Sequence, residues 1–117
     1  MAAASKNRRK ITVGDMQYLW YVAEDDEGAG MVLQVISTDK QFVAKYQIGQ
    51  PQGEDYIVIL GRRFAGAKTG GPWRRFLCPC FATHTVTPRA VRQLIEWCLD
   101  ESVARQEIDW RSRSLSL

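Results

Sequence analysis

Short apolar runs separated by turn residues fill the first 85 positions of the chain. Residues 11–13 are apolar or β-branched, the dipeptide 14–15 is glycine followed by aspartate, and residues 17–23 are rich in aromatic and β-branched side chains. This order predicts a β-hairpin. The polar segment after it contains two glycines and ends the run, and the apolar pattern resumes at 31–36. We expect a further strand there.

Two later runs differ in how many of their faces are apolar. Residues 41–48 alternate, so that Phe42, Ala44, Tyr46 and Ile48 share one face of a predicted strand. Residues 56–60 are apolar at every position, which predicts a strand covered on both faces or lying at an interface. The strands follow one another at intervals of about ten residues, too close for parallel crossovers, and this favours an antiparallel meander.

One helix is predicted near the C-terminus. The hydroxyl of Thr87 can cap its first turn. Pro88 suits the first helical position, because an N–H at that position has no hydrogen-bond acceptor within the helix and proline loses nothing by lacking one. A stripe of apolar residues then recurs at helical spacing, which predicts a helix over 88–103 lying on a sheet. The stripe consists of Val91, Leu94, Ile95, Cys98 and Leu99.

The fold class predicted from these patterns is α+β: an antiparallel sheet of about five to six strands in a meander, with one C-terminal helix packed on one face. We expect residues 1–10 to form a basic disordered tail, 11–110 a single domain and 111–117 a frayed end. Residues 108–110 can add a short terminal strand or a segment that packs against the domain.

Two segments resemble a known group of proteins in layout. The opening KITVGDMQYLWYV and the later VTPRAVRQLI are similar to small uncharacterised bacterial proteins that combine a strand-rich body with a helix begun by a Thr-Pro step. The resemblance covers only these segments. It implies the same fold and no particular activity, so it assigns no functional residue.

Composition adds bounds on size and location. The chain has 117 residues, of which 45% are hydrophobic and 25% charged, as in an average globular domain. Its longest apolar runs are far below the roughly 18 residues of a membrane span, and no apolar stretch of a secretory signal follows the basic start. We therefore expect a cytoplasmic protein with no membrane partner, whose three cysteines are free thiols.

Charge is distributed in blocks of opposite sign. Residues 11–55 contain eight acidic residues and two lysines, whereas 56–95 contain seven basic residues and no acidic one. Such blocks steer proteins toward one another, and tryptophans are enriched at interfaces. Trp20, Trp73, Trp97 and Trp110 make up an unusual share of this chain. The main prediction is a non-enzymatic interaction module that forms a homodimer or binds another protein.

A nucleic-acid-binding module is the alternative. Basic and aromatic side chains alternate in 61–76, as in sites that bind the backbone of a single strand by charge and its bases by stacking. The candidate residues are Arg62, Arg63, Lys68, Trp73, Arg74 and Arg75. Against this function, the arginines can instead pair with acidic residues of 24–27 or with Glu54 and Asp55.

The same stretch does not match the motif of a phosphate-binding loop. That motif requires a lysine directly after its second glycine, whereas here Ala67 separates Gly66 from Lys68.

The third alternative is a metal or thiol site. If 76–84 is extended, Cys78, Cys80 and His84 share one face, and Cys98 of the helix stripe can approach them. Three cysteines and a histidine form a known structural zinc set, although free cysteines are also common core residues, which is the interpretation we expect to hold. The chain has one histidine, and no constellation of paired carboxylates, histidines or nucleophiles in it is typical of an active site. We therefore expect no cofactor, assign no catalytic residue and lean against an enzyme.

Overall fold

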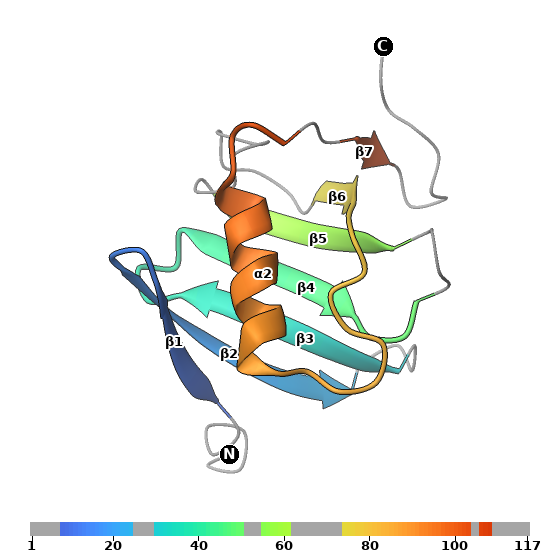
Figure 1. Cartoon of the computed structure of the whole chain (residues 1–117), viewed down its shortest axis with the longest axis horizontal. Coiled ribbons are helices and arrows are strands. Elements are labelled where there is room, and N and C mark those ends of the chain that lie inside the picture. The colour runs from blue at the N-terminus through green and yellow to red at the C-terminus, as the bar shows by residue number, and fades with distance from the viewer. Residues whose placement is uncertain (1–7, 25–29, 51–54, 62–73, 104–105, 109–117) are drawn as a thin grey trace.

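The computed structural model describes residues 8–24, 30–50, 55–61, 74–103 and 106–108. These residues form an antiparallel sheet of seven strands whose order in space is their order in the chain, with one helix packed against it (Figure 1). The elements are β1 (Arg9–Val13), β2 (Met16–Glu24), β3 (Met31–Ser37), β4 (Phe42–Gln47), β5 (Tyr56–Gly61), β6 (Arg74–Leu77), α2 (Pro88–Leu99) and β7 (Glu107–Ile108). This confirms the predicted α+β meander, and the short β7 brings the number of strands to seven.

The connections between strands are fixed by local hydrogen bonds. The β1–β2 hairpin turns at Gly14, whose φ of 64° suits a residue without a Cβ. In the β3–β4 turn, the hydroxyl of Ser37 accepts a hydrogen bond from the Phe42 N–H at 3.0 Å and donates one to Asp39 at 2.6 Å. Lys40 adopts a φ of 61° in the same turn. These bonds set the register in which β3 and β4 pair.

A buried glutamine holds the start of β5 against the end of β4. The side-chain amide of Gln50 donates to the carbonyl oxygens of Gln47 and Tyr56, at 3.0 and 2.9 Å, and its oxygen accepts from the Tyr56 N–H at 3.0 Å. Buried backbone groups of this kind need hydrogen-bond partners. Gln50 therefore does here what a neighbouring strand would do.

Helix α2 begins as the sequence predicts. The Thr87 hydroxyl accepts from the Ala90 N–H at 3.1 Å, and Pro88 occupies the first turn. The predicted end at 103 is wrong, because the helix ends at Leu99. Asp100 leaves the helical conformation, and its carboxylate accepts hydrogen bonds from the backbone N–H and hydroxyl of Ser102. Such a side-chain turn competes with a further helical turn. The helix is not long and apolar enough to cross a membrane.

The helix lies across the strands on one side of the sheet, which we call the near face (Figure 1). Four residues of its stripe, Val91, Leu94, Ile95 and Cys98, are fully buried against near-face side chains of the strands, and the fifth, Leu99, is partly buried. Those side chains include the predicted alternating set from β4, of which Phe42, Ala44 and Tyr46 are fully buried and Ile48 is partly buried. The hydrophobic core therefore lies between the sheet and this one helix.

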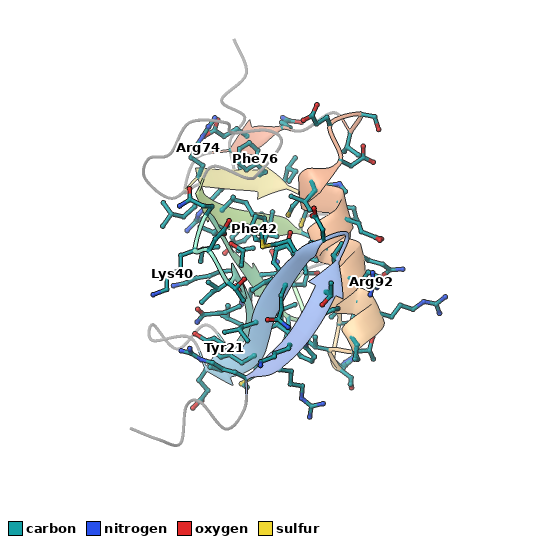
Figure 2. All side chains as sticks on the ribbon, turned by 90° about the vertical axis from the view of Figure 1, so that its left-hand side faces the viewer. Tyr21, Lys40, Phe42, Arg74, Phe76 and Arg92 are labelled. Carbon is teal, nitrogen blue, oxygen red and sulfur yellow. The ribbon has the colours of Figure 1, made fainter. Side chains whose placement is uncertain are left out.

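The opposite side of the sheet, the far face, has no helix over it among the described residues (Figure 2). β5 shows the difference between the two faces: Ile57 and Ile59 point to the near face and are buried, whereas Tyr56, Val58 and Leu60 point to the far face and are half-buried. Among the described residues, no helix covers the far-face side chains of 56–60. The interface at this run stays a prediction.

Candidate functional site

The cysteines and the histidine do not form a cluster. β6 ends at Leu77, so the strand through His84 that a shared face would require is not formed, and Cys78 and Cys80 lie in the connection 78–87. Pro79 has no N–H to donate to a neighbouring strand. Cys98 is buried on the sheet-facing side of α2, Cys78 is half-buried and Cys80 is exposed. Among the described residues, which include all four, no group of three or more side chains is placed to hold a metal ion.

The connection is instead held to the sheet by a buried tyrosine. The hydroxyl of Tyr46 donates to the Asp55 carboxylate at 2.5 Å and accepts from the Phe81 N–H at 3.0 Å. The backbone oxygen of Asp55 in turn accepts from the Cys78 N–H at 3.0 Å. Tyr46 is fully buried and Asp55 is 3% exposed. The phenol and the carboxylate thus link β4, the residue before β5 and the segment after β6.

This environment determines the protonation of two groups. Burial, with a smaller effect from the hydrogen bond to Asp55, raises the pKa of Tyr46 far above its ordinary value. Burial and the Asp55 carboxylate also raise the pKa of the Cys78 thiol. The nucleophilic form of cysteine is the thiolate, so Cys78 is held in its unreactive form at neutral pH. The geometry therefore favours a structural role for this cluster.

The basic segment is divided between the two faces of the sheet. Arg62, Arg63, Lys68 and Trp73 lie outside the described residues, whereas Arg74 and Arg75 lie in β6. Because neighbouring strand residues alternate, Arg74 shares the near face with Phe76 and Arg75 points to the far face. The two arginines therefore do not form one patch.

Arg74 is engaged within the fold. Its guanidinium binds the Glu107 carboxylate of β7 through two hydrogen bonds, of 2.9 and 2.6 Å. This bond lowers the pKa of Glu107 and raises that of Arg74. Asp55, one of the acidic partners considered for the arginines, is instead bonded to Tyr46. The acidic residues at 25–27 and 54 lie outside the described residues.

The far face carries an aliphatic row that the sequence pattern did not reveal. Leu19 lies opposite Ile36, Ile36 opposite Val43, and Val43 opposite Leu60. All four are half-buried. The row runs at right angles to the strands from β2 to β5, and at about 4.8 Å per strand it is roughly 14 Å long. Lys10 of β1 lies opposite Leu19 and ends the row with a cation.

A second row runs beside the first and is mostly polar. It passes from Tyr21 through Gln34, Lys45 and Val58 to Arg75, again directly opposite one another on β2 to β6. Figure 2 shows Tyr21 on the side of the sheet away from the helix. The guanidinium of Arg8 lies 5.1 Å from the centre of the Tyr21 ring, and that of Arg75 lies 4.9 Å from the centre of the Tyr56 ring.

Within the described strands, the charged side chains of the far face are all positive. Among the described strands, the acidic residues are Glu24 and Glu107, and both lie on the near face because they pair with Met31 and Phe76. The far-face positions are Lys10 and Thr12, the alternate positions of 17–23, 32–36, 43–47 and 56–60, and Arg75, Leu77 and Ile108. This set contains lysine and arginine but no carboxylate. The described part of the far face thus has a half-buried aliphatic row beside cations, and Val32 and Ile108 on the same face are buried.

No family model, curated protein or solved structure matches this chain. Its function must therefore be inferred from its own residues.

Two signals in the sequence point to the far face. The run 56–60 is apolar at every position, and alternate side chains of a strand point to opposite faces. Some of its apolar side chains therefore point away from the helix. The alternation of side chains along each strand places the cations Lys10, Lys45 and Arg75 on the same face as the aliphatic residues. The second signal becomes visible only when the register of the strands is known, because the four aliphatic residues are contributed by four separate strands.

Proposed function

We propose that this protein is a non-enzymatic interaction module whose docking surface is the far face. The proposal is carried by one observation: Leu19, Ile36, Val43 and Leu60 form a continuous, half-buried aliphatic row on a face where the described strands place cations and no carboxylate. A row of this kind loses water when a partner covers it, which favours association.

The far face supports a protein partner more strongly than a nucleic acid. Sites for single strands place aromatic rings along the path of the bases. Here the continuous row is aliphatic, and the two half-buried tyrosines, Tyr21 and Tyr56, each have an arginine over the ring. Of the six candidate residues for nucleic-acid binding, the structure describes Arg74 and Arg75, and of these two only Arg75 points to this face. Binding of nucleic acid is kept as an outcome of the crosslinking test.

The proposal is tested by photo-crosslinking in the cells that make the protein. A photoreactive amino acid is placed at Val43, in the middle of the aliphatic row, and in a matched variant at Gln93, which is exposed on the helix. We expect the photoreactive residue at position 43 to crosslink this chain to one discrete protein, whose mass differs from that of the chain itself. The residue at position 93 should give no such product. The proposal is wrong if position 43 yields no product, the same products as position 93, or a nuclease-sensitive product.

Self-association remains a separate prediction, based on the charge blocks along the chain. Because a dimer held by opposite charges is weakened by salt, we expect light scattering to show a dimer at about 50 mM salt and a smaller species at about 500 mM. A dimer formed by two far faces would respond in the opposite way, since salt screens the repulsion between their cations. A monomer at both concentrations would contradict self-association.

A further inference from the structure

β1 is the outermost strand of the sheet and pairs, among the described strands, with β2 alone. The turn between the two strands has two residues, so Val13 and Met16 form the hydrogen-bonded pair that closes the hairpin. Hydrogen-bonded and non-hydrogen-bonded pairs alternate along an antiparallel ladder. The backbone N–H and C=O groups of Lys10 and Thr12 therefore point away from β2, and we call these groups the outer edge of β1.

Helix α2 binds one group of this edge. Nη2 of Arg92 donates a hydrogen bond to the carbonyl oxygen of Thr12 at 3.0 Å. The bond agrees with the direction derived from the hairpin. Arg92 directly follows Val91 of the buried stripe, so it lies on the flank of the helix and not over the sheet. Figure 2 shows Arg92 on α2, beside the hairpin of β1 and β2.

Cations also lie along β1. Arg9 and Lys10 are exposed, and the strand contains no acidic residue. The guanidinium of Arg9 lies 5.7 Å from the centre of the Trp20 ring. Sheet proteins commonly use charged side chains, or a helix laid over the strand, to keep an edge strand from pairing with another chain. The contact from Arg92 combines both means at one carbonyl.

The strand that this edge fits is β1 of a second copy of the chain. In an antiparallel pair centred on Ile11, Lys10 lies opposite Thr12 of the second copy and Arg9 lies opposite Val13, so no cation faces a cation directly. The same centre places the outward groups of Lys10 and Thr12 in hydrogen-bonded pairs. The Thr12 carbonyls would accept half of these bonds, and Arg92 already occupies them.

We propose that Arg92 keeps the outer edge of β1 closed to β1 of a second copy of this chain. Its guanidinium binds the Thr12 carbonyl and places a cation where the incoming strand would lie. The inference is independent of the proposed docking function, because it concerns an edge of the sheet and not its far face.

The experiment compares the full-length wild type with Arg92→Ala by light scattering over a range of protein concentrations. About 500 mM salt screens the attraction and repulsion between surface charges, including those of the predicted charge-block dimer. We expect the dissociation constant for self-association to be at least about tenfold lower in Arg92→Ala, because a competing hydrogen bond is lost in each copy. Arg89→Ala removes another exposed cation of the same helix and should behave as the wild type does.

A second substitution shows whether the association uses the outer edge. Thr12→Pro removes the outward N–H and keeps the bonds to β2, as proline does on edge strands. Added to Arg92→Ala, it should return self-association to the wild-type level. Thr12→Val in the same background keeps the N–H and the β-branch, and should leave the association of Arg92→Ala unchanged.

Circular dichroism checks that each variant is folded. Alanine is a good helix former, and Arg92 is exposed, so we expect α2 to form in Arg92→Ala. If Thr12→Pro unfolds the chain, Lys10→Pro takes its place, since it removes the other outward N–H, and the same reversal is expected.

Three results would overturn the inference. Arg92→Ala could associate no more strongly than the wild type. Arg89→Ala could associate as strongly as Arg92→Ala, which would make the effect one of net charge. The association of Arg92→Ala could also persist with proline in β1, which would place it on another surface. None of these results bears on crosslinking from Val43, which tests the far face.

Discussion

Replacing Leu94 with alanine is expected to lower the free energy of unfolding by about 2–5 kcal/mol. Leu94 is fully buried at the centre of the α2 stripe, between the helix and the near face. Alanine leaves a cavity that the neighbouring strands, fixed by their hydrogen bonds, can fill only in part. Since small domains are stable by about 5–15 kcal/mol, urea denaturation should show a large fall in the unfolding midpoint.

The control for this variant is the adjacent residue. Gln93 is exposed on the same helix, and Gln93→Ala keeps a good helix former, so its free energy of unfolding should change by no more than about 0.5 kcal/mol. The slope of free energy against urea concentration should be unchanged in both variants. A loss of less than about 1 kcal/mol for Leu94→Ala would contradict the packing of α2 on the sheet.

Features of the fold that depend on neighbouring residues could be predicted from the sequence. The start of α2 is determined by Thr87 and Pro88, and its buried face by the spacing of Val91, Leu94, Ile95 and Cys98. The alternation in 41–48 likewise predicted which side chains of β4 would be buried. In each case the signal lies within one turn or one strand, and the structure confirms it.

Features that depend on contacts between distant residues were missed or wrong. The alternation of Phe76, Cys78 and Cys80 suggested a longer strand, but the hydrogen bond between Tyr46 and Phe81, a separation of 35 residues, holds this segment in another path. The aliphatic row was missed because its four members come from four strands. Arg74 and Arg75, neighbours in the sequence, could be assigned to opposite faces only once β6 was known to be a strand.

The hydroxyl of Tyr46 is expected to be the second large contributor to stability. Tyr46→Phe removes the donor to the buried Asp55 carboxylate and the acceptor of the Phe81 N–H. Because both partners then lack a hydrogen bond in a buried site, the free energy of unfolding should fall by about 2–4 kcal/mol. Tyr21→Phe is the control: its hydroxyl bonds Gln34 in a partly exposed position, and its loss should cost about 0.5–1.5 kcal/mol.

The same cluster predicts how stability changes with pH. The pKa of Tyr46 is raised in the folded protein by burial and by Asp55, so the folded state keeps this proton at pH values where the unfolded chain, with an ordinary pKa of about 10, loses it. The contribution of Tyr46 is therefore complete below about pH 10 and is lost as the pH rises further, by about 1.4 kcal/mol at pH 11.

The Tyr46→Phe variant separates this effect from the other groups that titrate in the same range. The pKa of Cys78 is also raised. Ionisation of this thiol in the unfolded chain therefore lowers stability at high pH, in the wild type and in the variant alike. The difference in unfolding free energy between the two proteins should therefore shrink by about 1.4 kcal/mol between pH 8 and pH 11, measured by urea denaturation under reducing conditions. A difference that stays constant over this range would mean that Tyr46 ionises equally in the folded and unfolded states. That result would contradict the buried hydrogen bond between Tyr46 and Asp55.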